Sequence, residues 1–130
     1  MGRFRYSYSV SGRSAGELSV PIDRMAKLGY DAVELGGGLS LADAGEVREL
    51  VEDAGMTVSS VCPSFTAERD LSHPDPELRA HGVRYLRGVV DLADALGAPK
   101  IIVAPTAFLR SRPIAPEEEE WGAGWDPPPW

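Results

Sequence analysis

Four side chains that can do chemistry stand at or near the ends of short apolar runs: Tyr8, Glu34, Cys62 and His73. A phenol, a thiol and an imidazole can each hydrogen-bond to a substrate hydroxyl, and a carboxylate can also transfer a proton. We therefore take these four as candidate substrate-binding residues. The pattern does not identify which residue is catalytic, and we expect no metal ligand among them.

Glu34 interrupts the apolar run 32–35. Alternate side chains of a strand face opposite sides, so Val33 and Leu35 are expected to face helices and Glu34 the other side. A buried carboxylate without a partner is costly. Two interpretations stay open: Glu34 binds a substrate hydroxyl or supports residues that do, or it forms a structural ion pair with Arg5 or another neighbour on the first strand.

The other three candidates also have ordinary structural explanations. Cys62 has no histidine beside it in sequence, and a lone cysteine is commonly a small buried hydrophobe. His73 precedes a helix and fits a solvated loop residue. Tyr6 and Tyr8 alternate along the first strand, where their hydroxyls either reach the mouth of a site or belong to the core.

Three glycines follow the second strand, Gly36 to Gly38. The dinucleotide pattern G-x-G-x-x-G would need a glycine in place of Leu41, and no lysine follows at P-loop spacing. A flexible loop between strand and helix is the expected structure, with backbone N–H groups available to a phosphate. A flavodoxin-like domain would require this loop to bind a nucleotide.

Three segments repeat one design, in which a glycine ends an amphipathic helix and a short apolar strand follows. The expected helices are 20–28, 43–54 and 76–96, and the expected strands are 4–10, 32–35, 57–62 and 100–104. Short strands alternating with helices pair in parallel through right-handed crossovers. The predicted fold class is α/β, with four parallel strands in a (β/α)4 arrangement.

Helix starts follow from capping residues. Ser19 is expected to cap the first helix, with Pro21 in its first turn. Asp43 and Glu46 have the spacing of a capping box, and Asp75 precedes a proline at the first helical position of the third helix. The third helix is expected to bury one apolar face, made of Leu78, Val83, Leu86, Val89, Val90 and Ala93.

Composition narrows the function. The chain has 130 residues, is 43% hydrophobic and carries a net charge of -7, with one cysteine. Such an acidic surface repels phosphate backbones, and no apolar run reaches the length of a membrane span, so we expect no nucleic-acid or membrane partner. The amino end has no apolar segment typical of a signal peptide, which indicates a cytoplasmic protein.

The last residues differ from the rest. Four successive glutamates, Glu117 to Glu120, precede the ending WGAGWDPPPW. Like charges, glycines and prolines form little regular structure. We predict two parts: a half-barrel domain at 1–112, and an acidic, Pro- and Trp-rich tail at 113–130 that is expected to be disordered.

Three stretches carry a resemblance to a known family: LGYDAVELG, EVRELVEDAGMTVSSVCPSF and LSHPDPELRAHGVRYLRGVVDLADALGAPKIIVAP. Their order and spacing resemble the N-terminal half of the xylose isomerase-like TIM barrels, over residues 5–105. That group holds sugar phosphate isomerases and epimerases, together with the endonuclease IV type. The face at the carboxyl ends of the strands is where such barrels build their sites.

The resemblance implies an isomerase or epimerase that acts on a small sugar or sugar phosphate by metal-assisted proton transfer in the complete barrel. It also implies a divalent metal (Mn, Mg, Co or Zn) held by residues of the second half, so this chain is expected to hold none and to be inactive alone. Endonuclease-type members have histidines where Cys62 and Ala104 stand here. Because alanine cannot bind zinc, the sugar branch fits better.

Such barrels need eight strand–helix units, about 250 residues. Four strands leave two open edges, which a homodimer or a complementary half-barrel chain would cover. A truncated, inactive product is a third arrangement. The alternative to an enzyme half is therefore a non-catalytic half-barrel that serves as an assembly module.

Overall fold

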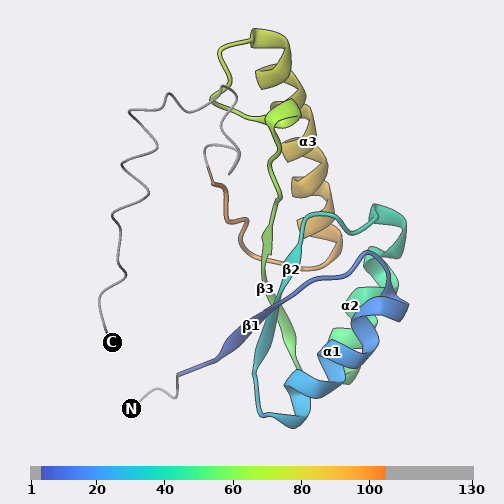
Figure 1. The fold of residues 1–130 in the computed structure, drawn as a ribbon. Coiled ribbons are helices and arrows are strands. Elements are labelled where there is room, and N and C mark those ends of the chain that lie inside the picture. The colour runs from blue at the N-terminus through green and yellow to red at the C-terminus, as the bar shows by residue number, and fades with distance from the viewer. Residues whose placement is uncertain (1–3, 105–130) are drawn as a thin grey trace.

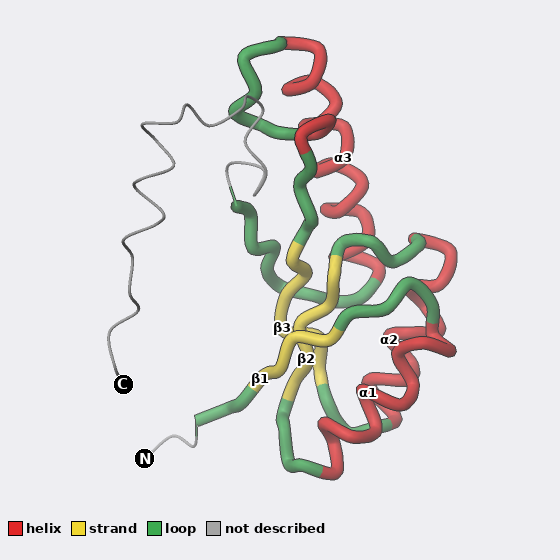
Figure 2. The backbone as a smooth tube through the Cα atoms, in the orientation of Figure 1, coloured by secondary structure: helices red, strands yellow, loops and turns green. Residues whose placement is uncertain are grey.

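A computed structural model describes residues 4–104, whose helices and strands alternate along the chain (Figures 1 and 2). The elements are β1 (Ser7–Val10), α1 (Ala15–Lys27), β2 (Ala32–Gly36), the 3-10 turn η1 (Leu41–Asp43), α2 (Ala44–Asp53), β3 (Thr57–Cys62), the 3-10 turn η2 (Ala67–Arg69) and α3 (Pro76–Ala95). The predicted tail at 113–130 lies outside the described residues.

The three strands form one sheet in the order β1-β2-β3, and both strand pairs are parallel. The predicted α/β class is confirmed. The fourth expected strand, 100–104, is reduced to a single parallel bridge between Ile101 and Val61. Val61 N donates to Lys100 O and Ile102 N donates to Val61 O, each at 3.0 Å. Among the described residues no further strand lies beyond this segment, so one side of it has nothing to pair with.

One face of the sheet packs against helices and forms the core. Val33 and Leu35 point to this side and are almost completely buried, as the alternation along β2 predicts. They meet Leu18 and Ile22 of α1 and Val47 of α2 in a single cluster of buried apolar side chains. The helices lie to one side of the strands (Figure 1). The opposite face is covered by no helix among residues 4–104.

Helix starts match the expectations in part. Asp75 caps α3 as predicted, because its Oδ1 accepts from Glu77 N at 2.8 Å. The capping box at Asp43 is wrong: its side chain makes no cap hydrogen bond, and the 3-10 turn before it leads the chain into α2. The predicted cap Ser19 is also wrong, since α1 begins five positions earlier and Ser14 caps it.

Glycines end α1, α2 and α3. Gly29, Gly55 and Gly97 have φ of 84°, 74° and 68°, a left-handed backbone that glycine adopts without a Cβ clash. Each glycine is followed within a few residues by a strand or, after Gly97, by the bridge at Ile101. The repeated helix, glycine and strand of the sequence is therefore also the repeat of the fold.

The buried face of α3 differs from the expected one. Val89 and Ala93 are buried, whereas Val83 and Val90 are about half exposed. The helix buries its other contacts through Leu92 and Leu96. Among residues 4–104, no element covers the side of α3 on which Val83 and Val90 lie, and no helix is both long and apolar enough to cross a membrane.

Candidate functional site

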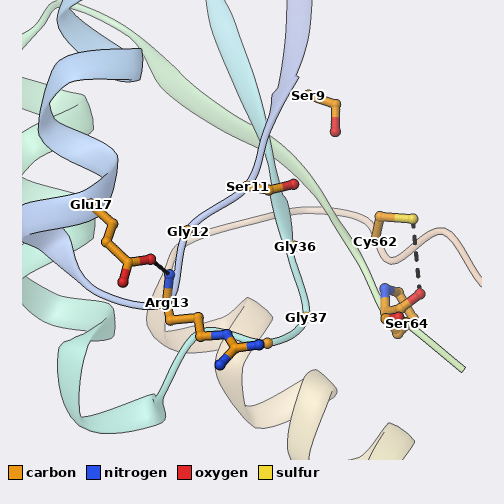
Figure 3. Close-up of a pocket in the computed structure, with 11 residues that line it drawn as sticks. Ser9, Ser11, Gly12, Arg13, Glu17, Gly36, Gly37, Cys62 and Ser64 are labelled. Atoms are coloured by element: carbon orange, nitrogen blue, oxygen red, sulfur yellow. Dashed lines mark hydrogen bonds between the residues drawn. The ribbon is translucent and has the colours of Figure 1, made fainter. Parts of the chain in front are cut away.

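A cavity of about 570 Å³ opens at the carboxyl ends of the three strands. Its wall comes from the last residues of β1, β2 and β3, from the loops that follow them and from the start of α1 (Figure 3). In a parallel sheet flanked by helices, this edge is where ligands bind, because the loops there can vary without disturbing the strands. The lining residues are Ser9, Ser11, Gly12, Arg13, Glu17, Gly36, Gly37, Gly38, Cys62, Pro63 and Ser64.

The glycine loop, Gly36 to Gly38, contributes backbone rather than side chains to the cavity. A Cβ on Gly37 would lie 2.8 Å from Pro63 Cα, whereas a Cβ on Gly36 or Gly38 would meet nothing within 4 Å. Only the middle glycine is therefore required by close packing. Gly37 N donates to Cys62 O at 2.9 Å, which holds the loop beside the end of β3.

Glu34 lies two residues before the glycine loop, on the face away from the helices. Its Oε2 accepts a hydrogen bond from Ser60 Oγ at 2.7 Å. Ser60 stands opposite because the register of β3 shifts by one residue between Val33 and Glu34. The considered ion pair with Arg5 is wrong: Arg5 lies at the amino end of the sheet, where its Nη2 donates to Thr57 Oγ1 at 3.0 Å.

Serines extend this hydrogen-bonded group across the sheet. Ser59 Oγ lies 3.1 Å from Val33 O, to which it donates, and 2.7 Å from Ser7 Oγ. A hydroxyl has one hydrogen, so Ser7 supplies the proton of the second bond. Ser60 is buried, and Glu34 is partly buried beside it. The open face of the sheet is therefore polar and ordered.

Cys62 lies at the end of β3, as predicted, and this residue lines the cavity; its binding of a substrate stays a prediction. Burial raises the pKa of the Cys62 thiol, and the negative charge of Glu34 raises it further. A raised pKa keeps the sulfur protonated at neutral pH, and a thiol is a much weaker nucleophile than a thiolate. Cys62 can therefore act as a polar lining atom more readily than as a nucleophile.

Arg13 and Glu17 line the cavity at the start of α1, which Ser14 caps. Ser14 Oγ accepts from Glu17 N at 3.3 Å, and Glu17 Oε2 accepts from Arg13 N at 2.9 Å. The Arg13 side chain extends toward Gly37 (Figure 3). The sequence prediction missed these residues, although Ser14 and Glu17 have the S-x-x-E spacing of a helix start.

Tyr8 and His73 are not brought to the cavity. Tyr8 pairs with Val33 in register, so the alternation places it on the helix side, where its ring meets Tyr30 edge to face at 5.5 Å. His73 Nδ1 accepts from Asp75 N at 3.0 Å and so belongs to the start of α3. Of the four candidates, Cys62 lines the cavity and Glu34 lies just below it.

The residues of the described part do not fit a metal site. Within residues 4–104, no three His, Cys, Asp or Glu side chains gather closely enough to hold an ion. No step through a metal is therefore assigned to this chain.

The sequence matches the xylose isomerase-like TIM barrel family over residues 22–126. This match covers most of the 130-residue chain, and the protein belongs to that family. The resemblance of the strand and helix stretches is thus confirmed.

Solved structures with the same fold include several sugar epimerases. One is D-psicose 3-epimerase with D-fructose present, with a TM-score of 0.66 and 18% identity over 86% of this chain and 43% of that one. D-psicose 3-epimerase from Clostridium cellulolyticum H10, with D-tagatose, gives 0.64 and 20% over 75% and 36%. 3-keto-D-glucoside 4-epimerase from E. coli gives 0.63 and 16% over 78% and 38%. The chain spans less than half the length of these proteins.

Proposed function

We propose that this chain forms the N-terminal half of a sugar isomerase or epimerase barrel, and that its cavity binds hydroxyl groups of a small sugar or sugar phosphate. The observation that carries the proposal is the cavity at the carboxyl ends of β1, β2 and β3, into which serine hydroxyls, the glycine loop and Arg13 are placed. Membership of the family supports it, as does the fold shared with epimerases whose structures hold D-fructose or D-tagatose.

The lining suits a neutral, hydroxyl-rich ligand. Ser9, Ser11 and Ser64 offer hydroxyls that donate and accept, and the glycine loop offers backbone groups. Arg13 adds a cation at the rim, in a position to meet a phosphate or carboxylate substituent. A volume of about 570 Å³ leaves room for a monosaccharide.

Glu34 is the residue we assign to a sugar hydroxyl. Its Oε2 is occupied by Ser60, so the carboxylate is held in one orientation. A carboxylate has two oxygens and about four lone-pair sites, so it can accept further bonds while Ser60 donates to it. The proton transfer of the complete barrel is left to groups beyond residues 4–104.

Exposed apolar side chains beside both edges of the sheet support completion of the barrel by further strands and helices. On the β1 and α1 side, Val20 is 72% and Leu28 64% exposed. At the other end, Val90 and Ile102 are each 51% exposed. In a closed barrel both ends would be covered by the remaining strands and helices.

A homodimer or a complementary half-barrel chain would supply that cover, and this favours the second candidate function, a non-catalytic assembly module. Light scattering after size-exclusion chromatography separates the cases. A stable dimer supports a barrel closed by two copies. A monomer that stays soluble and monodisperse at high concentration would argue against any assembly through these edges.

Calorimetric titration tests sugar binding. We expect heat on addition of D-fructose, loss of that heat in Glu34→Gln, and no loss in Glu49→Gln, which removes an exposed carboxylate on α2. The same titration with a mononucleotide should give no binding. A nucleotide that binds while the sugar does not would contradict the proposal and favour a flavodoxin-like function. An assay for epimerisation should show no turnover by the monomer.

A further inference from the structure

The hydroxyl of Tyr85, on α3, lies between two loops that form one wall of the cavity. It accepts a hydrogen bond from Ser64 N at 3.0 Å and donates one to Gly37 O at 3.3 Å. A phenol hydroxyl has one hydrogen and two lone pairs, so both bonds form together. Gly37 follows β2 and Ser64 follows β3, and both line the cavity. One side chain thus joins two loops that are separate in sequence.

The ring that carries this hydroxyl is held from several sides. Phe65 meets the Tyr85 ring edge to face at 5.7 Å, and the Arg69 guanidinium lies 4.0 Å from the ring centroid. Gly82, one turn earlier on α3, lets the backbone of η2 approach, because a Cβ there would lie 2.9 Å from Arg69 O. The ring is therefore packed into one orientation, and the position of the hydroxyl follows from it.

The two loops also approach each other at backbone distance. A Cβ on Gly37 would stand 2.8 Å from Pro63 Cα and 3.0 Å from the Tyr85 hydroxyl oxygen. Gly37 N already donates to Cys62 O. The loops therefore meet without side chains between them, and their separation depends on backbone hydrogen bonds and on Tyr85.

We propose that Tyr85 is a positioning residue. Its hydroxyl fixes the glycine loop against the loop after β3 and so sets the shape of the cavity wall. The hydrogen bonds from Tyr85 to the two loops need no bound ligand. The expected effect of Tyr85 on sugar binding rests on the proposed function.

Amide hydrogen exchange followed by NMR tests the hold on the loops. Ser64 is an exposed residue, so its amide should exchange quickly unless the hydroxyl of Tyr85 accepts from it. In the unmodified chain we expect slow exchange at this amide. Tyr85→Phe keeps the ring and removes the hydroxyl, and we expect the Ser64 amide to exchange about five-fold faster or more, as for loss of one hydrogen bond.

Tyr30→Phe is the matched control. It removes the same hydroxyl from another partly buried ring that packs against the core, and it should leave the Ser64 amide unchanged. An unprotected Ser64 amide in the unmodified chain would overturn the proposal. The proposal would also be overturned if the Ser64 amide of Tyr85→Phe exchanged at the unmodified rate. The same holds if all amides of that variant exchanged faster by the same factor, since a uniform change reflects overall stability alone.

A D-fructose titration of the same variants tests the consequence for binding. Tyr85→Phe should raise the apparent Kd several-fold, and Tyr30→Phe should not. Equal Kd values in all three proteins would show that Tyr85 does not shape the sugar site. If the unmodified chain binds no fructose, the proposed function fails at this cavity, while the Ser64 amide still decides whether Tyr85 holds the loops.

Discussion

The two faces of the sheet differ in what they contain and in what covers them. The helix side carries Val33 and Leu35, which are 0% and 1% exposed and belong to one apolar core. The opposite side carries the hydrogen-bonded pairs Ser7–Ser59 and Ser60–Glu34, and leads to the cavity at the carboxyl ends of the strands. Because side chains alternate along a strand, a single five-residue segment such as β2 supplies both faces.

This contrast assigns stability mainly to the helix face, and the proposed sugar binding mainly to the opposite face. The interior of a complete TIM barrel is filled by side chains from its strands, commonly branched apolar ones. In this chain, the sheet face that would form the barrel interior carries Ser7, Glu34 and Ser60. Because the polar groups of this face are already hydrogen-bonded, they avoid the free-energy cost of unpaired buried groups. The same groups can form hydrogen bonds with the hydroxyls of a ligand.

The largest expected effect comes from the helix face. Leu35→Ala should lower the free energy of unfolding by about 2–5 kcal/mol, because it removes buried contacts and leaves a cavity. Ser9→Ala, on the open face and exposed, should change it by no more than about 0.5 kcal/mol. Urea denaturation measures both. Similar losses in the two variants would break the distinction between the faces.

Alanine substitutions in the glycine loop test the packing where the open face of the sheet meets the cavity. Gly37→Ala should cost about 1–3 kcal/mol, because the new Cβ would overlap Pro63 and the backbone must shift. Gly38→Ala has open space and no left-handed backbone, and should be neutral. Thermal unfolding of both variants gives the result. A Gly37→Ala protein as stable as Gly38→Ala would show that the loops do not touch.

A smaller loss of stability is expected for the hydrogen-bonded serines and Glu34 on the open face. Ser60→Ala removes the hydroxyl that donates to Glu34 and should cost about 1 kcal/mol, the usual net value of a hydrogen bond. Ser9→Ala serves again as the control on the same face. Chemical denaturation resolves this difference. A stabilising effect of Ser60→Ala would mean that the polar group is not ordered as described.

The smallest expected effect concerns the pH dependence of Cys62. Burial and the charge of Glu34 raise the pKa of the thiol, so its alkylation by iodoacetamide should reach half its maximal rate at a higher pH in the folded chain than in urea. Glu34→Gln removes the second cause and should move that midpoint to lower pH. The midpoint, unlike the absolute rate, does not depend on access of the reagent. A midpoint that Glu34→Gln leaves in place would contradict proximity of the two groups.

Much of the fold could be predicted from local signals. The strand Thr57–Cys62 has the predicted bounds, because Gly55 and Pro63 limit it on both sides. The start of α1 was mispredicted because Pro21 suggested a first turn, whereas it lies inside the helix. The exposed positions of Val83 and Val90 could not be predicted either, since the apolar pattern of α3 suits a neighbour that the described residues do not contain.

The site was harder to predict, because its contacts join residues far apart in sequence. Ser60 meets Glu34 only through a one-residue register shift in β3, and Tyr85 reaches Gly37 across 48 positions. No spacing rule of a single helix or strand contains such pairs. The position of Cys62 was predictable because it depends only on where a strand ends.

The central claim is that the cavity at the carboxyl ends of the strands, next to the open face of the sheet, binds a sugar. An amide chemical-shift map of the chain titrated with D-fructose tests it most directly. The account predicts shifts that concentrate at the glycine loop and at Ser64, with little change at Val33 and Leu35. Shifts confined to the apolar edges near Leu28 or Ile102, or none at saturating sugar, would contradict it.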